Sequence, residues 1–235
     1  MKKKYKAIGF DLGDTLIEYE NVPLNWKELY GNALEGAMKV CKLKENKKKL
    51  EKAKEILLKY NTRENPRTYE VTAEQIFSEI LKTWNVFSEE NLHGAIKKFF
   101  SFFQMKAKVF DDTIVTLQVL QQKGIPIGVF TDVPYGMSTS LVQKDVKQIQ
   151  KYITILLSSV DVGYRKPEQK VFNTLASRLA VSKKYMIYVG NEEKDIVGAK
   201  NAGMFAVLLD RNDTGKSFGE DKRIATLQEL LPLFS

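Results

Sequence analysis

The sequence contains very few of the side chains on which many enzymes and metalloproteins depend. Its 235 residues include one cysteine, Cys41, and one histidine, His93. A single cysteine cannot form an internal disulfide, which fits a reducing compartment, and we expect a cytoplasmic protein. A single histidine, placed in a predicted helix, argues against a Ser–His–Asp triad and against a histidine-rich zinc site.

Long apolar runs and glycine-rich phosphate loops are also missing. No apolar run approaches the roughly 18–20 residues that span a bilayer, so we expect no membrane segment. The start of the chain, MKKKYKAIGF, is basic and then apolar, but its apolar part is short and is broken by Gly9 and Asp11, so we expect no signal peptide. The glycines form neither GxxxxGK[ST] nor a strand-linked GxGxxG, which removes the usual support for nucleotide binding.

Basic residues exceed acidic ones, with 37 Lys+Arg against 29 Asp+Glu and a net charge of +8. The lysines alternate with glutamates in helical segments such as KENKKKLEKAKEILLKY. These segments lack the interleaved aromatic residues that stack on bases, so we expect no nucleic-acid partner. Charge of this kind favours solubility and the steering of small anions.

The first half of the chain has the pattern of a helical region. From Pro23 to about Lys106, apolar residues recur at three- and four-residue steps, which predicts about four amphipathic helices with no strand between them. Thr72 and Gln75 have the spacing of a capping box at the start of one helix. Another helix is predicted to begin near Ser88 and to run into the aromatic-rich FFSFFQM.

After residue 107 the pattern changes to alternating strands and helices. Apolar runs predict strands at 125–130, 153–160, 185–189 and 205–209, in addition to one at 6–10 near the start of the chain. Helices are predicted between them at 114–122, 168–180 and 195–202. This alternation is typical of an α/β fold with a parallel sheet and helices on its faces.

Polar residues follow four of these predicted strands. They are Asp11, Thr131, Lys166 and the group Asn191–Asp195. Functional residues of open parallel sheets lie at the carboxyl ends of the strands, so we expect these side chains to meet at one edge. Together they supply a carboxylate, a hydroxyl, an ammonium and an amide–acid cluster, which suits the binding of an anion together with a divalent cation.

The segments FDLGDTL, FTD, YRKP and VGNEEKDIVGAKNAGM resemble the four ordered motifs of the haloacid dehalogenase (HAD) superfamily. The resemblance implies a Rossmann-like core, with a parallel sheet and helices on both faces, made by residues 1–17 and 107–235. It implies that residues 18–106, between the first and second motifs, form the family's all-helical cap of the C1 kind. It also implies a hydrolase acting on a small phosphorylated substrate.

The family resemblance gives roles to several residues. It implies that Asp11 is the nucleophile that becomes an aspartyl-phosphate. Thr131 would hydrogen-bond the phosphate, assisted by the backbone amide of Asp132. Lys166 would pair with both the nucleophile and the phosphate.

The resemblance also implies a Mg²⁺ cofactor, which prefers hard oxygen ligands. Asp11 and the backbone carbonyl of Gly13 would supply two of them. The family usually has Gly-Asp in the fourth motif, where this chain has Gly190-Asn191. Asn191 would therefore be a neutral ligand, and either Asp195 or Glu192 would restore the missing charge, directly or through water.

The first motif departs from the family at the position of the acid–base residue. Family phosphatases have an acid two residues after the nucleophile, and a positioned acid–base contributes ~10²–10⁴-fold in rate. Here that position is Gly13, and an acid follows at Asp14. Three alternatives remain: Asp14 takes over proton transfer, only substrates with good leaving groups are hydrolysed, or the protein binds phosphate ligands with little turnover.

A 2-haloacid dehalogenase is a further alternative, because it also lacks the second acid. Dehalogenases need no Mg²⁺, however, and the acid-rich residues Glu192, Glu193 and Asp195 favour a metal site. We therefore favour phosphoryl hydrolysis. Specificity is expected to come from the helical cap, where Arg67 in the irregular segment NPRTYE is the preferred anion contact. The sequence specifies neither the substrate nor the oligomeric state.

Overall fold

The computed structural model describes residues 5–20, 23, 25–103 and 107–234, and the chain forms two compact units. The first unit comprises Met1–Tyr19, Ala107–Asp132 and Thr139–Ser235, and the second comprises Glu20–Lys106 and Val133–Ser138. The boundary that we expected after residue 17 therefore lies two residues later, and a short segment after the second motif joins the helical unit. None of the helices in these ranges has the length and apolarity to cross a membrane.

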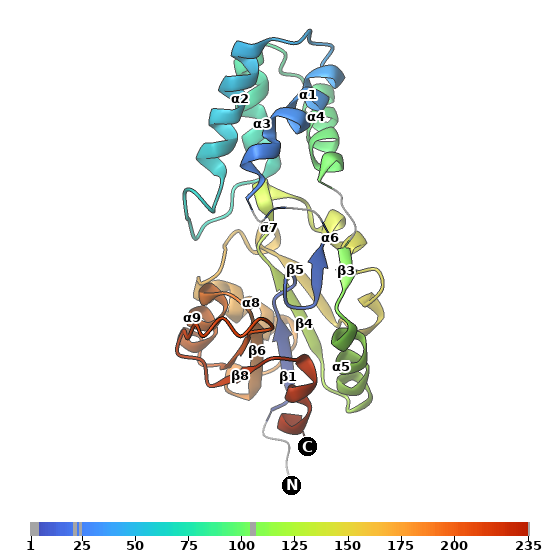
Figure 1. Ribbon diagram of the computed structural model, residues 1–235, viewed down its shortest axis with the longest axis vertical. Helices are drawn as coiled ribbons and strands as arrows, with labels where there is room; N and C mark the ends of the chain where they lie inside the picture. The colour runs from blue at the N-terminus through green and yellow to red at the C-terminus, as the bar shows by residue number, and fades with distance from the viewer. Residues whose placement is uncertain (1–4, 21–22, 24, 104–106, 235) are drawn as a thin grey trace. The chain divides into compact units, whose positions relative to one another are not determined.

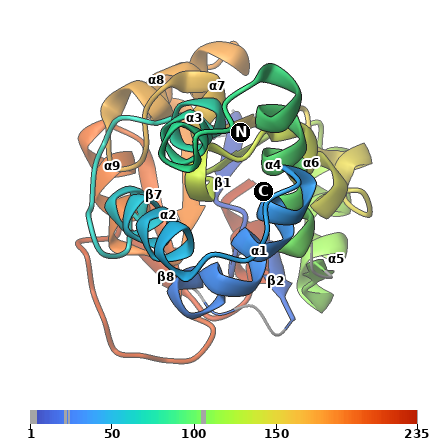
Figure 2. The same ribbon diagram turned by 90° about the horizontal axis from the view of Figure 1, so that it is seen from above.

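The second unit is helical, as the periodicity predicts (Figures 1 and 2). Its main helices are α1 (Tyr30–Val40), α2 (Lys47–Tyr60), α3 (Ala73–Trp84) and α4 (Glu89–Phe102), preceded by the short helix η1 (Trp26–Leu29). α1 packs beside α4, and α2 packs beside α3. The capping box predicted at Thr72 is confirmed. The Thr72 hydroxyl accepts from the backbone N–H of Gln75, and the Gln75 side-chain oxygen accepts from the backbone N–H of Thr72. Residues 104–105 of the predicted FFSFFQM helix lie outside the described residues.

Aromatic side chains fill the interior of the helical unit. The rings of Trp26 and Phe103 stack with centroids 3.8 Å apart, and Phe99 is fully buried. The segment Val133–Ser138 contributes Tyr135, whose ring packs against Trp26, Tyr30 and Phe99 and whose hydroxyl is hydrogen-bonded to that of Tyr30. We predicted this segment as a loop. It belongs to the helical unit because a buried aromatic residue anchors its short helix η2 (Pro134–Gly136) there.

The first unit is built on a six-stranded parallel sheet in the order β5-β4-β1-β6-β7-β8 (Figure 1). Its strands are β1 (Ala7–Phe10), β4 (Ile127–Thr131), β5 (Ile155–Ser158), β6 (Met186–Gly190), β7 (Phe205–Leu209) and β8 (Lys222–Ile224). The predicted parallel α/β fold is confirmed. The chain proceeds in one direction from β1 to β4 and β5, then in the other from β6 to β8, and ligands of open α/β sheets bind where the order reverses in this way.

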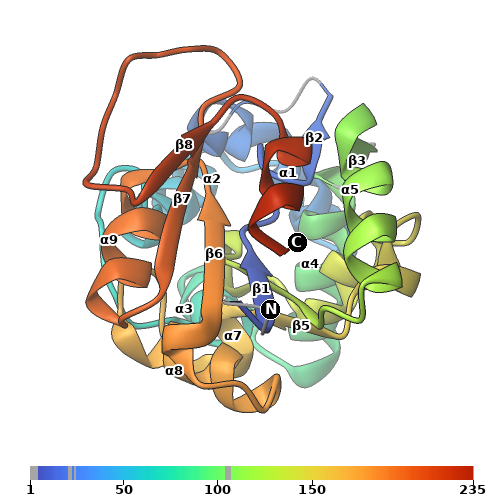
Figure 3. The ribbon, with the colours of Figure 1, turned by 90° about the horizontal axis from the view of Figure 1, so that it is seen from below.

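Helices cover both faces of this sheet, as predicted (Figure 3). α8 (Gln169–Arg178) and α9 (Glu193–Asn201) lie on one face, and α5 (Asp111–Gln122) with η5 (Leu227–Phe234) lies on the other. The core under α8 and α9 is apolar and includes the fully buried rings of Phe130, Phe172 and Tyr188. Shorter helices are α6 (Thr139–Asp145), η3 (Gln150–Tyr152), α7 (Ser159–Val162) and η4 (Lys183–Tyr185).

Two details of the first unit differ from the prediction. The apolar run 153–160 is only partly a strand, because Ser158 and Asp161 form a capping box that starts α7. A separate antiparallel pair, β2 (Ile17–Tyr19) with β3 (Ala107–Val109), joins the points where the chain leaves and re-enters the unit. Each of these strands has only three residues, which is too short for a period of two to be recognised.

The close packing of α9 on α8 depends on Gly198. A Cβ atom at this position would lie 2.2 Å from Cε2 of Phe172, a ring that is fixed in the core. We predict that Gly198→Ala lowers the free energy of unfolding by about 1–3 kcal/mol, because the ring or the helix must move. In contrast, a Cβ at Gly31 in α1 would meet its nearest atom, Cε of Lys54, at 3.7 Å.

Gly31→Ala is therefore the matched control, and it should leave stability unchanged or raise it by up to about 1 kcal/mol through helix propensity. Urea unfolding followed by circular dichroism measures both variants. Equal midpoints for Gly198→Ala and the wild type would contradict this account of the α8–α9 contact.

Candidate active site

The loop after β1 places Asp11 at the carboxyl end of the central part of the sheet. The backbone N–H of Asp11 still donates to the carbonyl of Val189 in β6, at 2.9 Å, so this residue continues the ladder of the strand. The loop then folds into a tight turn in which the carbonyl of Leu12 accepts from the N–H groups of Leu16 and Ile17. The nucleophile expected from the sequence is thus held by regular backbone on one side and a closed turn on the other.

Lys166 joins two carboxylates that are far apart in the sequence. Its Nζ lies 2.5 Å from Oδ1 of Asp11 and 2.6 Å from Oδ1 of Asp195, and its side chain is fully buried. The rings of Phe130 and Tyr188 lie about it, with centroids 5.8 and 6.0 Å from Nζ. Burial disfavours the charged ammonium, but the two carboxylates outweigh this and raise the pKa of Lys166 well above its usual value. The lysine is therefore a fixed positive charge.

For Asp11, in contrast, burial outweighs the neighbouring charges and disfavours the ionised form. It raises the pKa of Asp11 to about 7, although Lys166 acts to lower it. A further positive charge beside this carboxyl group would lower its pKa, because an opposite charge favours the ionised form.

Asp195 is held by the start of α9. It forms a capping box with Glu192, whose backbone N–H donates to Oδ2 of Asp195 at 3.0 Å. The other oxygen, Oδ1, is the one paired with Lys166. A Cβ atom on Gly190 would lie 2.3 Å from Cγ of Asp195, so only glycine allows this approach. Both oxygens of Asp195 are thus engaged in fixing the helix start and the lysine.

The end of β4 brings Thr131 and Asp132 to the same edge. Thr131 is the last residue of the strand, and Oδ1 of Asp132 accepts from the backbone N–H of Lys166 at 3.1 Å. Oδ2 of Asp132 lies 3.1 Å from Nζ of Lys194, which also pairs with Glu192 at 2.8 Å. Burial disfavours the ionised form of Asp132, but these lysines outweigh it and lower its pKa.

Asn191 follows β6 and is hydrogen-bonded to the loop that follows Asp11. The hydroxyl of Thr15, which is fully buried, donates to Oδ1 of Asn191 at 3.2 Å. This bond orients the amide oxygen that we expected as a metal ligand. It also joins the first and fourth motifs directly.

Gly13 and Asp14 differ sharply in their surroundings. A Cβ atom on Gly13 would meet nothing within 4 Å, and its φ lies outside the left-handed region. Asp14 is exposed, has a left-handed φ of 55°, and donates its N–H to the carbonyl of Ile17 at 2.7 Å. Asp14 is therefore a turn residue by its backbone, and proton transfer by its side chain stays a prediction.

Arg67 lies in the helical unit, where its guanidinium group is mostly buried. Nη1 donates to the carbonyl of Tyr60 at 2.8 Å, and Nη2 lies 3.4 Å from Oε1 of Glu70. Both partners belong to the same unit. The contact of Arg67 with a substrate anion stays a prediction.

The carboxylate, amide and carbonyl oxygen atoms at the sheet edge are of the kind that Mg²⁺ prefers. In the ranges that the structure describes, no group of three or more His, Cys, Asp or Glu side chains is arranged to hold a metal ion. The set expected from the sequence combines the carboxylates of Asp11 and Asp195 with the neutral oxygens of Gly13 and Asn191, and the structure pairs Asp195 with Lys166 and with the backbone N–H of Glu192. Such a set fits Mg²⁺ in ligand type, with most of its coordination left to water and substrate.

Two basic residues near the site escaped the sequence analysis. Lys194 lies within the fourth motif, where the prediction covered only Asn191 and the acids. Arg211 follows the end of β7, and its guanidinium donates to the carbonyl of Thr15 at 3.0 Å. The rule that identified Asp11, a polar residue directly after a parallel strand, indicates Asp210 after β7, and Arg211 comes one residue later.

Comparison with known proteins agrees with this geometry. The model of the haloacid dehalogenase-like hydrolase family matches residues 10–209. A phosphoglycolate phosphatase of Escherichia coli is 30% identical over 131 residues, covering 53% of this chain and 50% of that protein. A glyceraldehyde 3-phosphate phosphatase of Methanopyrus kandleri is 33% identical over 106 residues, covering 44% of each. The chain thus spans about half the length of these curated relatives.

Solved structures share the fold over nearly the whole chain. A HAD phosphatase from Thermococcus onnurineus superposes with a TM-score of 0.62 at 22% identity, covering 97% of both chains. A 2-haloacid dehalogenase from Pseudomonas syringae superposes with a TM-score of 0.64 at 24% identity, again over 97% of both. The match to the family model over most of the sequence, with the motif residues gathered at one edge of the sheet, shows that the chain belongs to the haloacid dehalogenase-like hydrolases.

Proposed function

We propose that this protein is a Mg²⁺-dependent phosphatase of a small phosphorylated metabolite that works through an aspartyl-phosphate on Asp11. The observation that carries the proposal is the buried Lys166, held between Asp11 and Asp195 at the carboxyl edge of the sheet. A fixed ammonium beside a carboxylate suits a phosphoryl group, whose charge must be neutralised before an anion can attack it. The similarity to two phosphatases named for small phosphorylated metabolites supports the substrate class.

The reaction has two displacements at phosphorus. In the first, a carboxylate oxygen of Asp11 bonds to phosphorus, the bond to the leaving oxygen breaks, and that oxygen departs with the electron pair and takes up a proton. In the second, water attacks the aspartyl-phosphate, which releases inorganic phosphate and restores the carboxylate. Lys166, the hydroxyl of Thr131 and the backbone amide of Asp132 bind the phosphoryl oxygens and orient the group for attack.

Mg²⁺ would be held by Asp11, the carbonyl of Gly13 and the amide oxygen of Asn191. When bound, it supplies positive charge to the transferring phosphoryl group. Burial already raises the pKa of Asp11 to about 7, so a cation at this carboxylate also favours the ionised nucleophile. We expected Asp195 as a further ligand, but its contacts favour a different role, that of fixing Lys166.

A second candidate is a protein that binds phosphate ligands with little turnover. The observation that favours it is Gly13, which brings no acid to the position where the family has its proton donor. The two candidates differ in one measurable property, the formation and hydrolysis of a phosphoenzyme.

Hydrolysis of an aryl phosphate with and without Mg²⁺ tests the proposed function. We expect activity that requires Mg²⁺ and falls by at least about 10³-fold in Asp11→Asn, because the nucleophile is lost. A beryllofluoride adduct detected by ¹⁹F NMR in the wild type and absent in Asp11→Asn would support the same residue. Binding of phosphate without any turnover would favour the second candidate, and halide release from a 2-haloacid without Mg²⁺ would favour a dehalogenase.

The open space at Gly13 allows the missing acid to be supplied. We predict that Gly13→Asp raises turnover of an alkyl phosphate by about tenfold or more, because a carboxyl group can then protonate the leaving oxygen. Gly13→Ala, which adds only the Cβ atom, should give no gain. If both variants behave alike, the position does not reach the leaving group.

Asp14→Asn tests the other source of the proton, with Asp213→Asn as its control. Both residues are exposed and have a positive φ, which asparagine also adopts readily. If Asp14 transfers the proton, only Asp14→Asn should lower turnover of alkyl phosphates, with a smaller effect on aryl phosphates. Equal rates in the two variants would show that Asp14 only shapes the turn and does not transfer the proton.

Gly190→Ala tests the role of Asp195 in fixing Lys166. The new Cβ atom would overlap the carboxyl group of Asp195, so the lysine should lose this partner or follow it. We predict a fall in turnover of about 10²-fold, the size expected when a binding group is misplaced by about 1 Å. Gly13→Ala, where a Cβ atom meets nothing, is again the matched control. Unchanged turnover in Gly190→Ala would show that the ion pair with Asp11 is enough to hold Lys166 in place.

A further inference from the structure

Arg211 connects the end of β7 to the loop that carries the nucleophile. Its Nη1 and Nη2 atoms lie 2.9 Å from the two carboxylate oxygens of Asp112, which makes a two-pronged ion pair. Nη2 also donates to the backbone carbonyl of Thr15 at 3.0 Å. One planar guanidinium therefore holds both a helix start and the turn after Asp11.

The acid in this pair is itself firmly held. Asp112 lies in the first turn of α5, and its Oδ2 also accepts the backbone N–H of Leu227 at 2.8 Å. The guanidinium carbon of Arg211 lies 4.0 Å from the centroid of the Phe110 ring. The next residue of the helix, Thr113, is fully buried and donates its hydroxyl to the carbonyl of Leu16 at 2.9 Å. The nucleophile loop is thus bound at two successive carbonyls from the side of α5.

The contacts continue from this loop to the candidate metal ligand. The backbone carbonyl of Thr15 accepts a hydrogen bond from Arg211. The hydroxyl of Thr15 donates to the amide oxygen of Asn191 and so orients it. The order is Asp112, Arg211, Thr15 and Asn191, with each member in direct contact with the next. A neutral metal ligand contributes no charge to affinity, so its orientation matters more than that of a carboxylate.

We infer that Arg211 is a positioning residue for the Mg²⁺ and nucleophile site, acting through Thr15 on Asn191 and on the turn after Asp11. The inference rests on the proposed function for its metal, but the restraint on the loop is independent of any reaction. Outer partners of metal ligands typically change metal affinity by 10- to 100-fold when removed. A lysine cannot replace the arginine, because a single ammonium cannot hold two carboxylate oxygens and a carbonyl in one plane.

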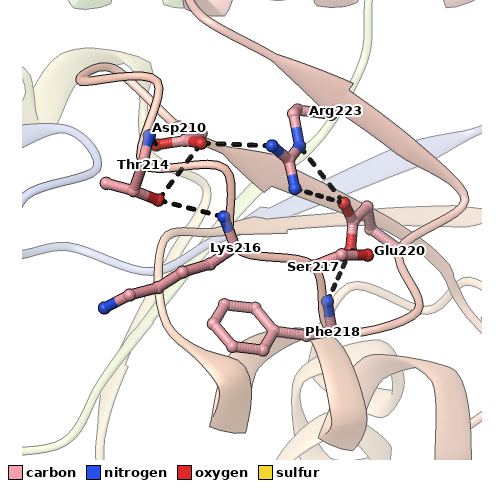
Figure 4. Close-up of polar contacts among 7 residues, drawn as sticks. All are labelled: Asp210, Thr214, Lys216, Ser217, Phe218, Glu220 and Arg223. Carbon is pink, nitrogen blue, oxygen red and sulfur yellow. Dashed lines mark hydrogen bonds and ion pairs between the residues drawn. The ribbon is translucent and has the colours of Figure 1, made fainter.

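Arg223, in β8, provides a matched comparison (Figure 4). Its guanidinium also bridges two acids, with Nη1 3.4 Å from Oδ2 of Asp210 and Nη2 3.2 Å from Oε1 of Glu220. Oδ1 of Asp210 also accepts the backbone N–H of Thr214. These bonds order the connection between β7 and β8. The hydrogen bonds and ion pairs described for Arg223 do not include the nucleophile loop.

The test compares Arg211→Met, Arg211→Lys and Arg223→Met with the wild type in two measurements that need no turnover. Hydrogen–deuterium exchange of peptides covering residues 11–17 reports the restraint on the loop. Electron paramagnetic resonance titration with Mn²⁺ alone reports the metal site. For both Arg211 variants we expect severalfold faster exchange at residues 11–17 and Mn²⁺ affinity lowered about 10-fold or more. Arg223→Met should match the wild type in both, even if its melting temperature falls.

Unchanged exchange at residues 11–17 or unchanged Mn²⁺ affinity in the Arg211 variants would overturn the inference. So would equal changes in Arg211→Met and Arg223→Met, which would indicate a loss of general stability. A wild type that binds Mn²⁺ and lacks all phosphatase activity would overturn the proposed function alone. In that case the two measurements would still decide the role of Arg211.

Discussion

The ion pairs of Lys166 with Asp11 and Asp195 are the interaction on which the rest of the site depends. Buried charges are costly to desolvate, and apolar residues of similar size often stabilise a fold equally well. The three residues therefore contribute little that folding requires. What they supply is a charge fixed in place before a ligand arrives, which is the property that phosphoryl transfer needs from a protein. The fold makes this possible by bringing the end of β1, the segment between α7 and α8 and the start of α9 to one edge of the sheet.

The acids at this edge are divided between two tasks. Asp195 forms an ion pair with Lys166, and Asp132 forms one with Lys194. The side chains of both acids are almost fully buried. Asp11 is the acid whose pKa is raised by its burial, to about 7. A further cation at this edge would therefore be most favourable beside Asp11, because it would stabilise the ionised carboxylate. If Asn191 holds such a cation, as proposed, its neutral amide brings no charge, and the orientation of its oxygen atom, set by the bond from Thr15, would matter more.

Sequence patterns predicted the parts of the site that lie directly at strand ends. Asp11 and Asn191 follow buried strands, whose apolar runs are easily recognised, and Thr131 ends one. Lys166 was predicted from its motif, but a short helix, α7, separates it from β5, and only the capping box at Ser158 gives a local signal for that helix. The ion pair of Asp195 with Lys166 and the hydrogen bond from Arg211 to Thr15 each join residues more than 25 positions apart. Contacts of this kind depend on how strands pair and not on local propensity, so a single sequence does not contain them.

The order of Gly13 and Asp14 is the least expected feature of the nucleophile loop. The left-handed position is residue 14, where glycine would adopt the backbone freely and aspartate does so at some cost. Position 13 has ordinary backbone and open space, so a side chain would be accepted there. Folding alone would therefore favour glycine at 14 and accept a residue with a side chain at 13, whereas the chain has glycine at 13 and aspartate at 14. The reason for glycine beside the nucleophile is better sought in the reaction, and substrates whose leaving group departs without a proton have no use for an acid at that point.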